Sequence, residues 1–359
     1  MAGSSIGDIF KVTTWGESHG EGLGAVIDGC PAGVGLCEED IQAYLDRRRP
    51  GKDAFATSRS EADKCRILSG VFEGRTTGTP ISVMVENNDQ HSKDYDALKD
   101  VYRPSHADFS YEAKYGIRDH RGGGRSSGRE TIGRVIAGAV ASKILSQKGI
   151  SFCTYVNSIG DVFCDPGYFE EGYILKNPLC MPDRTAFQVA SKRIEELREQ
   201  KDSVGSSVIC VVRGVPAGLG DPVFEKLDAN LAKAIFSIGA VKAFEVGDGF
   251  SLSMAKGSEA NDGFAPDENG NITQITNHSG GIIGGISTGA DIVLHVYFKP
   301  TPSIASLQKT ADRSANAVDL EIKGRHDPVI GPRAAVVVES MAAITLFDAY
   351  LKNLGARNE

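Results

Sequence analysis

Apolar positions recur every three or four residues in five stretches of the chain, as one buried face of an α-helix requires. In the first stretch, Ile41, Tyr44, Leu45 and Arg48 fall on one side, and Pro50 follows as a stop signal. Asp221 predicts an N-cap for the fourth stretch, with a proline in its first turn. The periodicity therefore predicts helices over residues 38–49, 130–148, 184–200, 222–236 and 333–354.

Short runs rich in β-branched residues, flanked by Gly, Pro or Asn, predict strands between these helices. The runs cover residues 81–85, 208–212, 241–246 and 292–298. Helices and strands alternate irregularly along the chain, which favours an α+β or layered α/β fold over a repeated βαβ barrel.

One turn sequence occurs twice, 185 residues apart. Residues 26–35 read VIDGCPAGVG and residues 211–220 read VVRGVPAGLG, and each copy leads from a strand towards a helix. A second, weaker echo places Thr77-Gly78 and Thr288-Gly289 before later strands. Pro and Gly recur in turns by chance, but the agreement favours a duplication. We therefore predict a single domain, 1–359, built from two related halves, roughly 1–180 and 181–359.

Composition narrows the class of protein. Hydrophobic residues make up 41% of the chain and charged residues 24%, which is typical of a globular protein. The 42 glycines follow no three-residue period, so they indicate tight turns or close approach to a ligand. The formal net charge of −8 argues against nucleic acid as the main partner.

The chain shows no apolar run of membrane-spanning length and no secretory signal pattern near Met1. Its seven cysteines are never spaced as C-x-x-C, which argues against a disulfide framework or a metal site. These features predict a cytoplasmic protein with reduced thiols.

A basic, glycine-rich segment carries the densest chemical signal. Residues 117–134 hold five arginines, three consecutive glycines (122–124) and the hydroxyls of Ser126 and Ser127, directly before a predicted helix. Helix N-termini and arginines both bind anions. The segment favours a site for a small anion. The alternatives are a solvated loop or an RNA-binding stripe, although the stripe lacks interleaved aromatic residues.

Other turns add acid–base groups and further cations. His19 and His106 each lie beside glycine or proline, and a third charged turn holds Arg325, His326 and Asp327. Arg47-Arg48-Arg49 ends the first predicted helix, where basic residues also serve as caps. The residues alone indicate an enzyme with an anionic ligand and His/Asp proton chemistry, and leave the reaction open. A non-catalytic RNA- or nucleotide-binding protein and a flavin-free enzyme acting on a phosphorylated metabolite are the competing hypotheses.

Taken together, these segments resemble the chorismate synthase family. The resemblance runs in order through residues 13–20, 47–51, 103–108, 120–133, 277–289, 299–303 and 325–333, and RGGGRSS at 121–127 followed by RET at 129–131 is its most specific part. It implies a layered β-α-β sandwich with helices between two antiparallel sheets, assembled as a homotetramer. The implied reaction is the 1,4-anti elimination of phosphate from 5-enolpyruvylshikimate 3-phosphate to give chorismate. It requires reduced FMN from an external source and involves no net redox change.

The resemblance also implies roles for individual residues. His19 matches the histidine that protonates the reduced flavin, His106 the donor to the departing phosphate, and Asp327 the carboxylate that helps remove the ring proton near flavin N5. The positions that match FMN contacts are Arg125, Ser126, Ser127, Gly239, Ala240, Gly284, Lys299, Thr301, Ser303 and Arg325. Candidates for the substrate anions are Arg48, Arg49, Arg134 and Arg333, and Arg48 also matches an NADP contact.

The sequence departs from the family pattern at three positions. Ser105 stands where a glycine is common, and Gly239 stands where a side chain is usual, so that only backbone is left there. Ala54 occupies a position where relatives have a second NADP-linked arginine, which puts direct binding of NADP in question.

Overall fold

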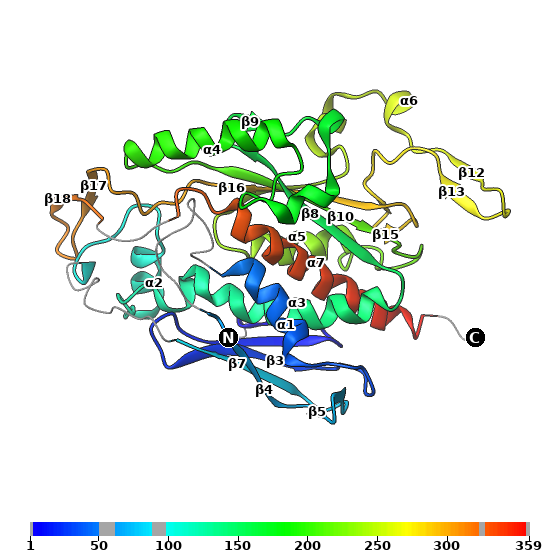
Figure 1. Ribbon diagram of the computed structural model, residues 1–359, viewed down its shortest axis with the longest axis horizontal. Helices are drawn as coiled ribbons and strands as arrows, with labels where there is room; N and C mark the ends of the chain where they lie inside the picture. Colours follow the sequence, from blue (N-terminus) through cyan, green and yellow to red (C-terminus); the bar gives the residue numbers. More distant parts are fainter. Residues whose placement is uncertain (1–2, 50–61, 88–97, 323–326, 357–359) are drawn as a thin grey trace.

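Two antiparallel sheets of five strands each enclose a layer of helices (Figure 1). The computed structural model describes residues 3–49, 62–87, 98–322 and 327–356. The strand order is β1-β2-β3-β7-β4 in the first sheet and β11-β16-β10-β8-β9 in the second. The predicted α+β class and the layered sandwich implied by the resemblance are confirmed.

The elements have the following bounds. The first sheet consists of β1 (Ser5–Ile6), β2 (Lys11–Gly16), β3 (Gly22–Asp28), β7 (Ile81–Glu86) and β4 (Cys65–Ser69). The second consists of β11 (Val241–Val246), β16 (Ile292–Phe298), β10 (Ser206–Arg213), β8 (Ser151–Ile159) and β9 (Val162–Phe163). Four small hairpins pair β5 (Val71–Phe72) with β6 (Arg75–Thr76), β12 (Phe264–Pro266) with β13 (Ile272–Gln274), β14 (Ile282–Ile283) with β15 (Ile286–Ser287), and β17 (Gln308–Ala311) with β18 (Ala317–Leu320). The helices are α1 (Glu38–Arg48), α2 (Asp108–Tyr115), α3 (Thr131–Ser146), α4 (Arg184–Glu199), α5 (Leu227–Phe236), α6 (Gly257–Ala260) and α7 (Gly331–Asn353).

The helix layer divides between the two sheets. Helices α1 and α3 pack on the first sheet, α5 and α7 pack on the second, and α3 and α7 pack against each other in the middle. At their crossing, a Cβ added to Gly138 would lie 2.2 Å from the Cβ of Ser340. Only a glycine permits this approach, so helices α3 and α7 are in direct contact at the centre of the helix layer.

Helix α7 (Gly331–Asn353) is the longest of the described helices. It is the one described helix long and apolar enough to cross a membrane by composition, with a mean hydropathy of 1.6 over an 18-residue window. However, 78% of that window is buried inside the protein. Its apolar character is therefore explained by its place between the two sheets, where it has almost no polar face.

Most predicted elements are confirmed close to their predicted bounds, but the fourth helix starts later than predicted. It begins at Leu227, not at Pro222, so Asp221 is not its N-cap. Val223 has a φ of +68°, which a right-handed helix excludes. The N–H of Leu227 instead donates to the carbonyl of Gly285 at 2.8 Å, so a contact from the β14–β15 turn fixes the first helical turn.

The repeated turn sequence has the same hydrogen bonds in both copies. Gly33 N–H donates to Thr76 O at 2.8 Å, and Gly218 N–H donates to Ser287 O at 2.9 Å. The Thr76 hydroxyl donates to Pro31 O and the Ser287 hydroxyl to Pro216 O, both at 2.6 Å.

The order of elements also corresponds between the two sheets. Strands β2, β3, β7 and β4 occupy the places of β8, β10, β16 and β11, while α1 and α3 occupy those of α5 and α7. This correspondence supports a duplication. We propose that the halves meet in the turn between α3 and β8, near residue 150, rather than near residue 180.

Candidate functional site

The basic, glycine-rich segment folds directly over His19. We call residues 119–128 the glycine loop. Gly122, Gly123 and Gly124 have φ values of +70°, +85° and +52°. A Cβ at Gly122 would lie 2.3 Å from Cε1 and 2.5 Å from Nδ1 of His19, so the loop backbone packs directly against the imidazole. The His19 side chain is buried, and its Nδ1 lies 3.1 Å from the hydroxyl of Ser18. The loop therefore contributes to the burial of this histidine.

Most arginines of this segment are engaged by protein groups. The two terminal nitrogens of Arg125 donate to the carbonyls of Gly16 and Thr14, both at 3.1 Å. Arg134 bonds Glu130 at 2.7 Å and the carbonyl of Ser237 at 3.1 Å. Of the five described arginines in 117–134, only Arg121 has about half of its side chain exposed. This arrangement argues against an RNA-binding stripe, which needs exposed cations.

The two serines of the loop shape its backbone. The Ser126 hydroxyl donates to the carbonyl of Gly123 at 2.7 Å, and the Ser127 hydroxyl accepts from the N–H of Arg129 at 3.3 Å. Both bonds close short 3₁₀ turns that lead into α3. The hydroxyls thus lie at the start of the helix, where the peptide dipoles favour an anion.

A buried group of charged side chains lies beneath the loop. Asp63 has no exposed side-chain surface, and its two carboxylate oxygens take different guanidinium groups. Oδ1 accepts from Nη1 of Arg129 at 3.0 Å, and Oδ2 lies 3.4 Å from Nη1 of Arg48. Both arginines are almost fully buried. Asp63 is therefore the carboxylate that joins the end of α1 to the start of α3.

Asn87 couples this group to the turn that holds His19. Its side-chain oxygen accepts from Nε of Arg129 at 2.9 Å. Its side-chain nitrogen donates to the carbonyls of Glu17 and Gly20, at 3.0 and 2.9 Å. The position of the His19 turn thus depends on Arg129 through Asn87.

Asp327 joins the same group from the other half of the chain. Arg333 forms an ion pair with Asp327 and donates from Nε to the carbonyl of Arg48 at 3.1 Å. We refer to Arg48, Asp63, Arg129, Arg333 and Asp327 as the buried ion network. It links two of the predicted catalytic positions, since Asp327 is a member and His19 is attached through Asn87.

His106 lies where the two halves of the chain meet. Its Nε2 is 2.6 Å from the hydroxyl of Ser303, which is itself buried. Lys299 donates from Nζ to the carbonyl of Ser105 at 2.8 Å. The turn is fixed by Arg103, whose guanidinium takes both oxygens of Asp108 at 2.8 Å. Residues 299–303, at the end of β16, therefore pack against the His106 turn.

Ser105 adopts a left-handed backbone conformation, with a φ of +57°. A glycine carries no Cβ penalty there. We expect Ser105→Gly to raise the free energy of unfolding by up to about 1 kcal/mol in urea denaturation. Ser110→Gly in α2 is the matched control and should lower it by about 0.5–1 kcal/mol. Equal destabilisation by both variants would contradict the assigned strain.

Asp108 should make the protein sensitive to acid. Burial would raise the pKa of this carboxyl, but hydrogen bonds and charge from Arg103 outweigh it and hold the pKa below its ordinary value. The resulting stability is present above the unfolded pKa of about 3.9 and is lost as pH falls through the folded pKa. The stability gap between wild type and Asp108→Asn should therefore be largest at neutral pH and close below about pH 4. Urea denaturation across this range tests it, and a gap that does not change with pH would refute it.

Several positions matched to FMN contacts gather around Lys299. The N–H of Lys299 donates to the carbonyl of Ala240 at 3.0 Å, and burial lowers the pKa of its ammonium group. The hydroxyl of Thr301 is buried without a hydrogen-bond partner among the described residues. An orphaned hydroxyl between a lysine and Ser303 fits a ligand that offers acceptor oxygens.

Gly284 lies apart from this group. It occupies the turn of the β14–β15 hairpin, before β16 begins, whereas Lys299 follows the other end of that strand. In Figure 1, β15 lies at the right of the second sheet, whereas α2, which begins two residues after His106, lies at the left. Seven residues of strand span about 20 Å, so this chain alone does not bring Gly284 to Lys299. Arg325 lies outside the described residues, as do His326 and Ala54.

The sequence does not single out Asp63, Asn87 or Asp108 as site residues. Asp108 ends the segment 103–108, so its proximity to His106 is a weak signal. Asp63 and Asn87 lie in ordinary polar stretches, and their role depends on partners far along the chain.

Comparisons with known proteins agree over nearly the whole chain. The family model described as chorismate synthase matches residues 10–351. A chorismate synthase of Agathobacter rectalis is 58% identical over 357 residues, covering 99% of this chain and 97% of that protein. One of Methanosarcina mazei is 53% identical over 358 residues, with coverages of 98% and 97%. A crystal structure of chorismate synthase superposes with a TM-score of 0.78 at 32% identity, covering 98% of this chain and 94% of that one.

Proposed function

The chain belongs to the chorismate synthase family, whose members are carbon–oxygen lyases acting on phosphates, and from this premise we propose its reaction and the roles of its residues. The reaction is the 1,4-anti elimination of phosphate from 5-enolpyruvylshikimate 3-phosphate, which gives chorismate. The full-length similarity carries the proposal. The meeting of His106 with Ser303, across the two halves, supports it.

The family implies a flavin cofactor, and we propose that it is reduced FMN. Residues near Lys299, Thr301, Ser303 and Ala240 would hold it, together with the loop residues Arg125, Ser126 and Ser127. When bound, reduced FMN supplies electron density as the C–O bond breaks and regains it afterwards. We propose that an external system supplies the reduced flavin. Direct binding of NADP at Arg48 has less support, because that side chain is buried against Asp63.

The remaining chemistry belongs to side chains of this chain. His106 would move a proton from its ring to an oxygen of the departing phosphate, with Ser303 fixing the orientation of Nε2. Asp327, oriented by Arg333, would take part in removing the ring proton of the substrate. His19, under the glycine loop, would hold a proton facing the cofactor, in a place shielded from water.

The four candidate substrate arginines differ in exposure. Arg49 and Arg333 keep 38% and 27% of their side chains exposed, while Arg134 keeps 17% and Arg48 only 1%. We therefore assign direct contact with the substrate anions to Arg49 and Arg333. Arg48 and Arg134 would not touch the substrate but would fix the relative positions of α1, α3 and α5.

An anaerobic turnover assay tests the proposed function. The purified protein is mixed with 5-enolpyruvylshikimate 3-phosphate and dithionite-reduced FMN, and chorismate and phosphate are measured together. Equal amounts of both products are expected with reduced FMN, and none with oxidised FMN alone. Turnover without reduced flavin would favour the flavin-free enzyme. RNA affinity that falls steeply with salt, without turnover, would favour the binding protein.

The proposal also extends the family's homotetrameric assembly and a cytoplasmic location to this chain.

A further inference from the structure

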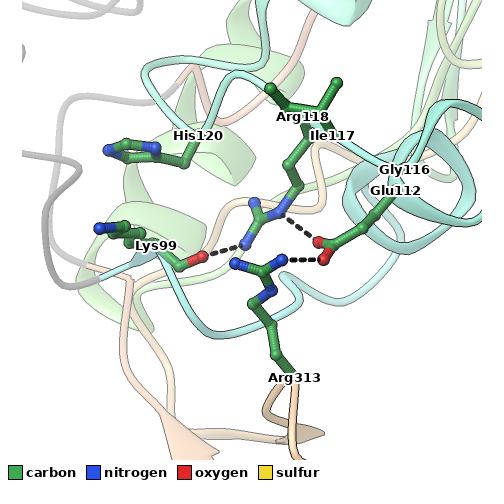
Figure 2. Close-up of a pocket in the computed structure, with 7 residues that line it drawn as sticks. All are labelled: Lys99, Glu112, Gly116, Ile117, Arg118, His120 and Arg313. Atoms are coloured by element: carbon green, nitrogen blue, oxygen red, sulfur yellow. Dashed lines mark hydrogen bonds and ion pairs between the residues drawn. The ribbon is translucent and has the colours of Figure 1, made fainter.

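A small cavity opens beside the glycine loop, on the side of Asp108 away from the His106 turn. Figure 2 shows residues of its wall, which come from the segment before the His106 turn (Lys99), from α2 (Glu112), from the residue just before the glycine loop (Arg118), from the start of that loop (His120) and from the β17–β18 hairpin (Arg313). Its volume is about 200 Å³. Asp108 connects the cavity to the described site, since its Oδ1 lies 2.8 Å from Nη2 of Arg103 and 3.3 Å from Nη1 of Arg118.

The acidic groups of the cavity are already paired. One oxygen of Glu112 lies 3.3 Å from Nε of Arg118, and the other lies 2.5 Å from Nη2 of Arg313. Arg313 also lies 3.7 Å from Asp100. Asp119, next to His120, is bonded to Arg121 at 2.9 Å. No described carboxylate lies within ion-pair distance of Lys99 or His120.

Two nitrogen-bearing side chains stay unpaired at the other end of the cavity. In Figure 2, the ring of His120 and the side chain of Lys99, which both line the cavity, lie to the left of the Glu112–Arg313 contact. Neither side chain makes a hydrogen bond or an ion pair with any residue that the structure describes. Arg118 adds a third donor, since its side chain is 94% buried and its Nη1, although 3.3 Å from Asp108, lacks a hydrogen bond.

We propose that this cavity binds a small oxyanion, a phosphate or a carboxylate group, through Lys99, His120 and the inner edge of Arg118. Nη1 of Arg118 has an ion-pair contact with Asp108 but makes no hydrogen bond, and an anionic oxygen in the cavity would accept one. The cavity is smaller than the roughly 300–1,000 Å³ of pockets that hold drug-sized ligands. Its occupant is therefore an ion or a single acidic group rather than a flavin.

The bound anion would influence the position of residues in the described site through two contacts. It would fix His120, which leads into the glycine loop, and it would share Arg118 with Asp108. Asp108 in turn holds Arg103 and the His106 turn. The cavity is thus a peripheral anion site, distinct from the place of the reacting substrate.

Nuclear magnetic resonance of histidine side chains tests this proposal. Protein with ¹³C-labelled histidine is titrated with inorganic phosphate, with acetate and, at matched ionic strength, with chloride. The His120 signal is assigned from the His120→Gln variant. We expect a saturable shift of His120 with phosphate or acetate at concentrations up to about 10 mM. The response of His19 and His106 reports separately on the described site, so binding there is not mistaken for binding here.

Charge removal supplies the decisive comparison. Lys99→Ala should weaken the anion response of His120 by about tenfold or more, because a charge-assisted hydrogen bond is lost. Lys309→Ala, which removes an exposed lysine of the β17–β18 hairpin outside the cavity, should leave it unchanged. A stronger response to phosphate than to acetate identifies a phosphate site, and the reverse a carboxylate site. An equal response to chloride, or equal effects of the two variants, would overturn the proposal.

Discussion

Changing His106 to alanine should lower kcat by about 10²–10⁴-fold, the usual contribution of a positioned general acid. The proton for the departing phosphate would then have to come from water, which is a weaker acid than a positioned imidazolium. The affinity for 5-enolpyruvylshikimate 3-phosphate should change little, because charge contacts from arginines dominate binding. Phosphate release under anaerobic conditions with reduced FMN gives kcat, and a binding titration gives the affinity.

Two further variants serve as a comparison and a control for this experiment. Ser303→Ala keeps the imidazole but removes its 2.6 Å partner, so it should lower kcat less than the loss of the ring itself. His278→Ala removes a histidine that pairs with Asp248 between β11 and β14, and it should leave kcat unchanged. If His106→Ala weakens substrate binding strongly with kcat intact, His106 is a binding group and not the proton donor.

Replacing Asp63 with asparagine should cost about 3–5 kcal/mol of unfolding free energy, the range for breaking a buried ion pair by removing one partner. Two nearly buried guanidinium groups would lose the carboxylate that joins them. Asparagine keeps the size of the side chain, so the loss reports charge rather than packing. Urea denaturation measures it, and Asp319→Asn, at an exposed position of β18, should stay within about 0.5 kcal/mol of wild type.

Activity gives a second measure of the Asp63 change. Arg129 holds Asn87, and Asn87 holds the turn of His19, so the variant should also lose turnover at temperatures where it is folded. Asp63→Glu retains the charge and should recover part of both losses. A cost below about 1 kcal/mol would mean that the arginines find other partners and that the network does not depend on this carboxylate.

The sequence predicts those features of the fold that depend on local periodicity. The apolar repeat in α1, with Ile41, Leu45 and Arg48 on one side, corresponds to the buried side of that helix. The start of α5 was not predictable in this way. It is fixed by Gly285, which is distant in the chain, so local capping residues gave the wrong position.

The residues of the candidate site also fall into those that the sequence identifies and those that only the tertiary structure identifies. Residues in distinctive turns, such as His106 and the three glycines, stand out from the sequence. What the arginines do could not be foreseen, because an arginine that binds a ligand and one that pairs with a distant Asp63 look alike in sequence. Burial decides between them, and burial is set by how the two sheets close over the helices.

The close contact of Gly138 with Ser340 restricts how the molecule can move. Interlocked backbones at the centre of the sandwich leave no hinge about which one sheet could swing away from the other. Entry of a reactant and escape of a product must therefore rely on rearrangement of peripheral segments. In this architecture, the segments outside the sandwich would open and close the site, while the two sheets and the helices between them keep their positions.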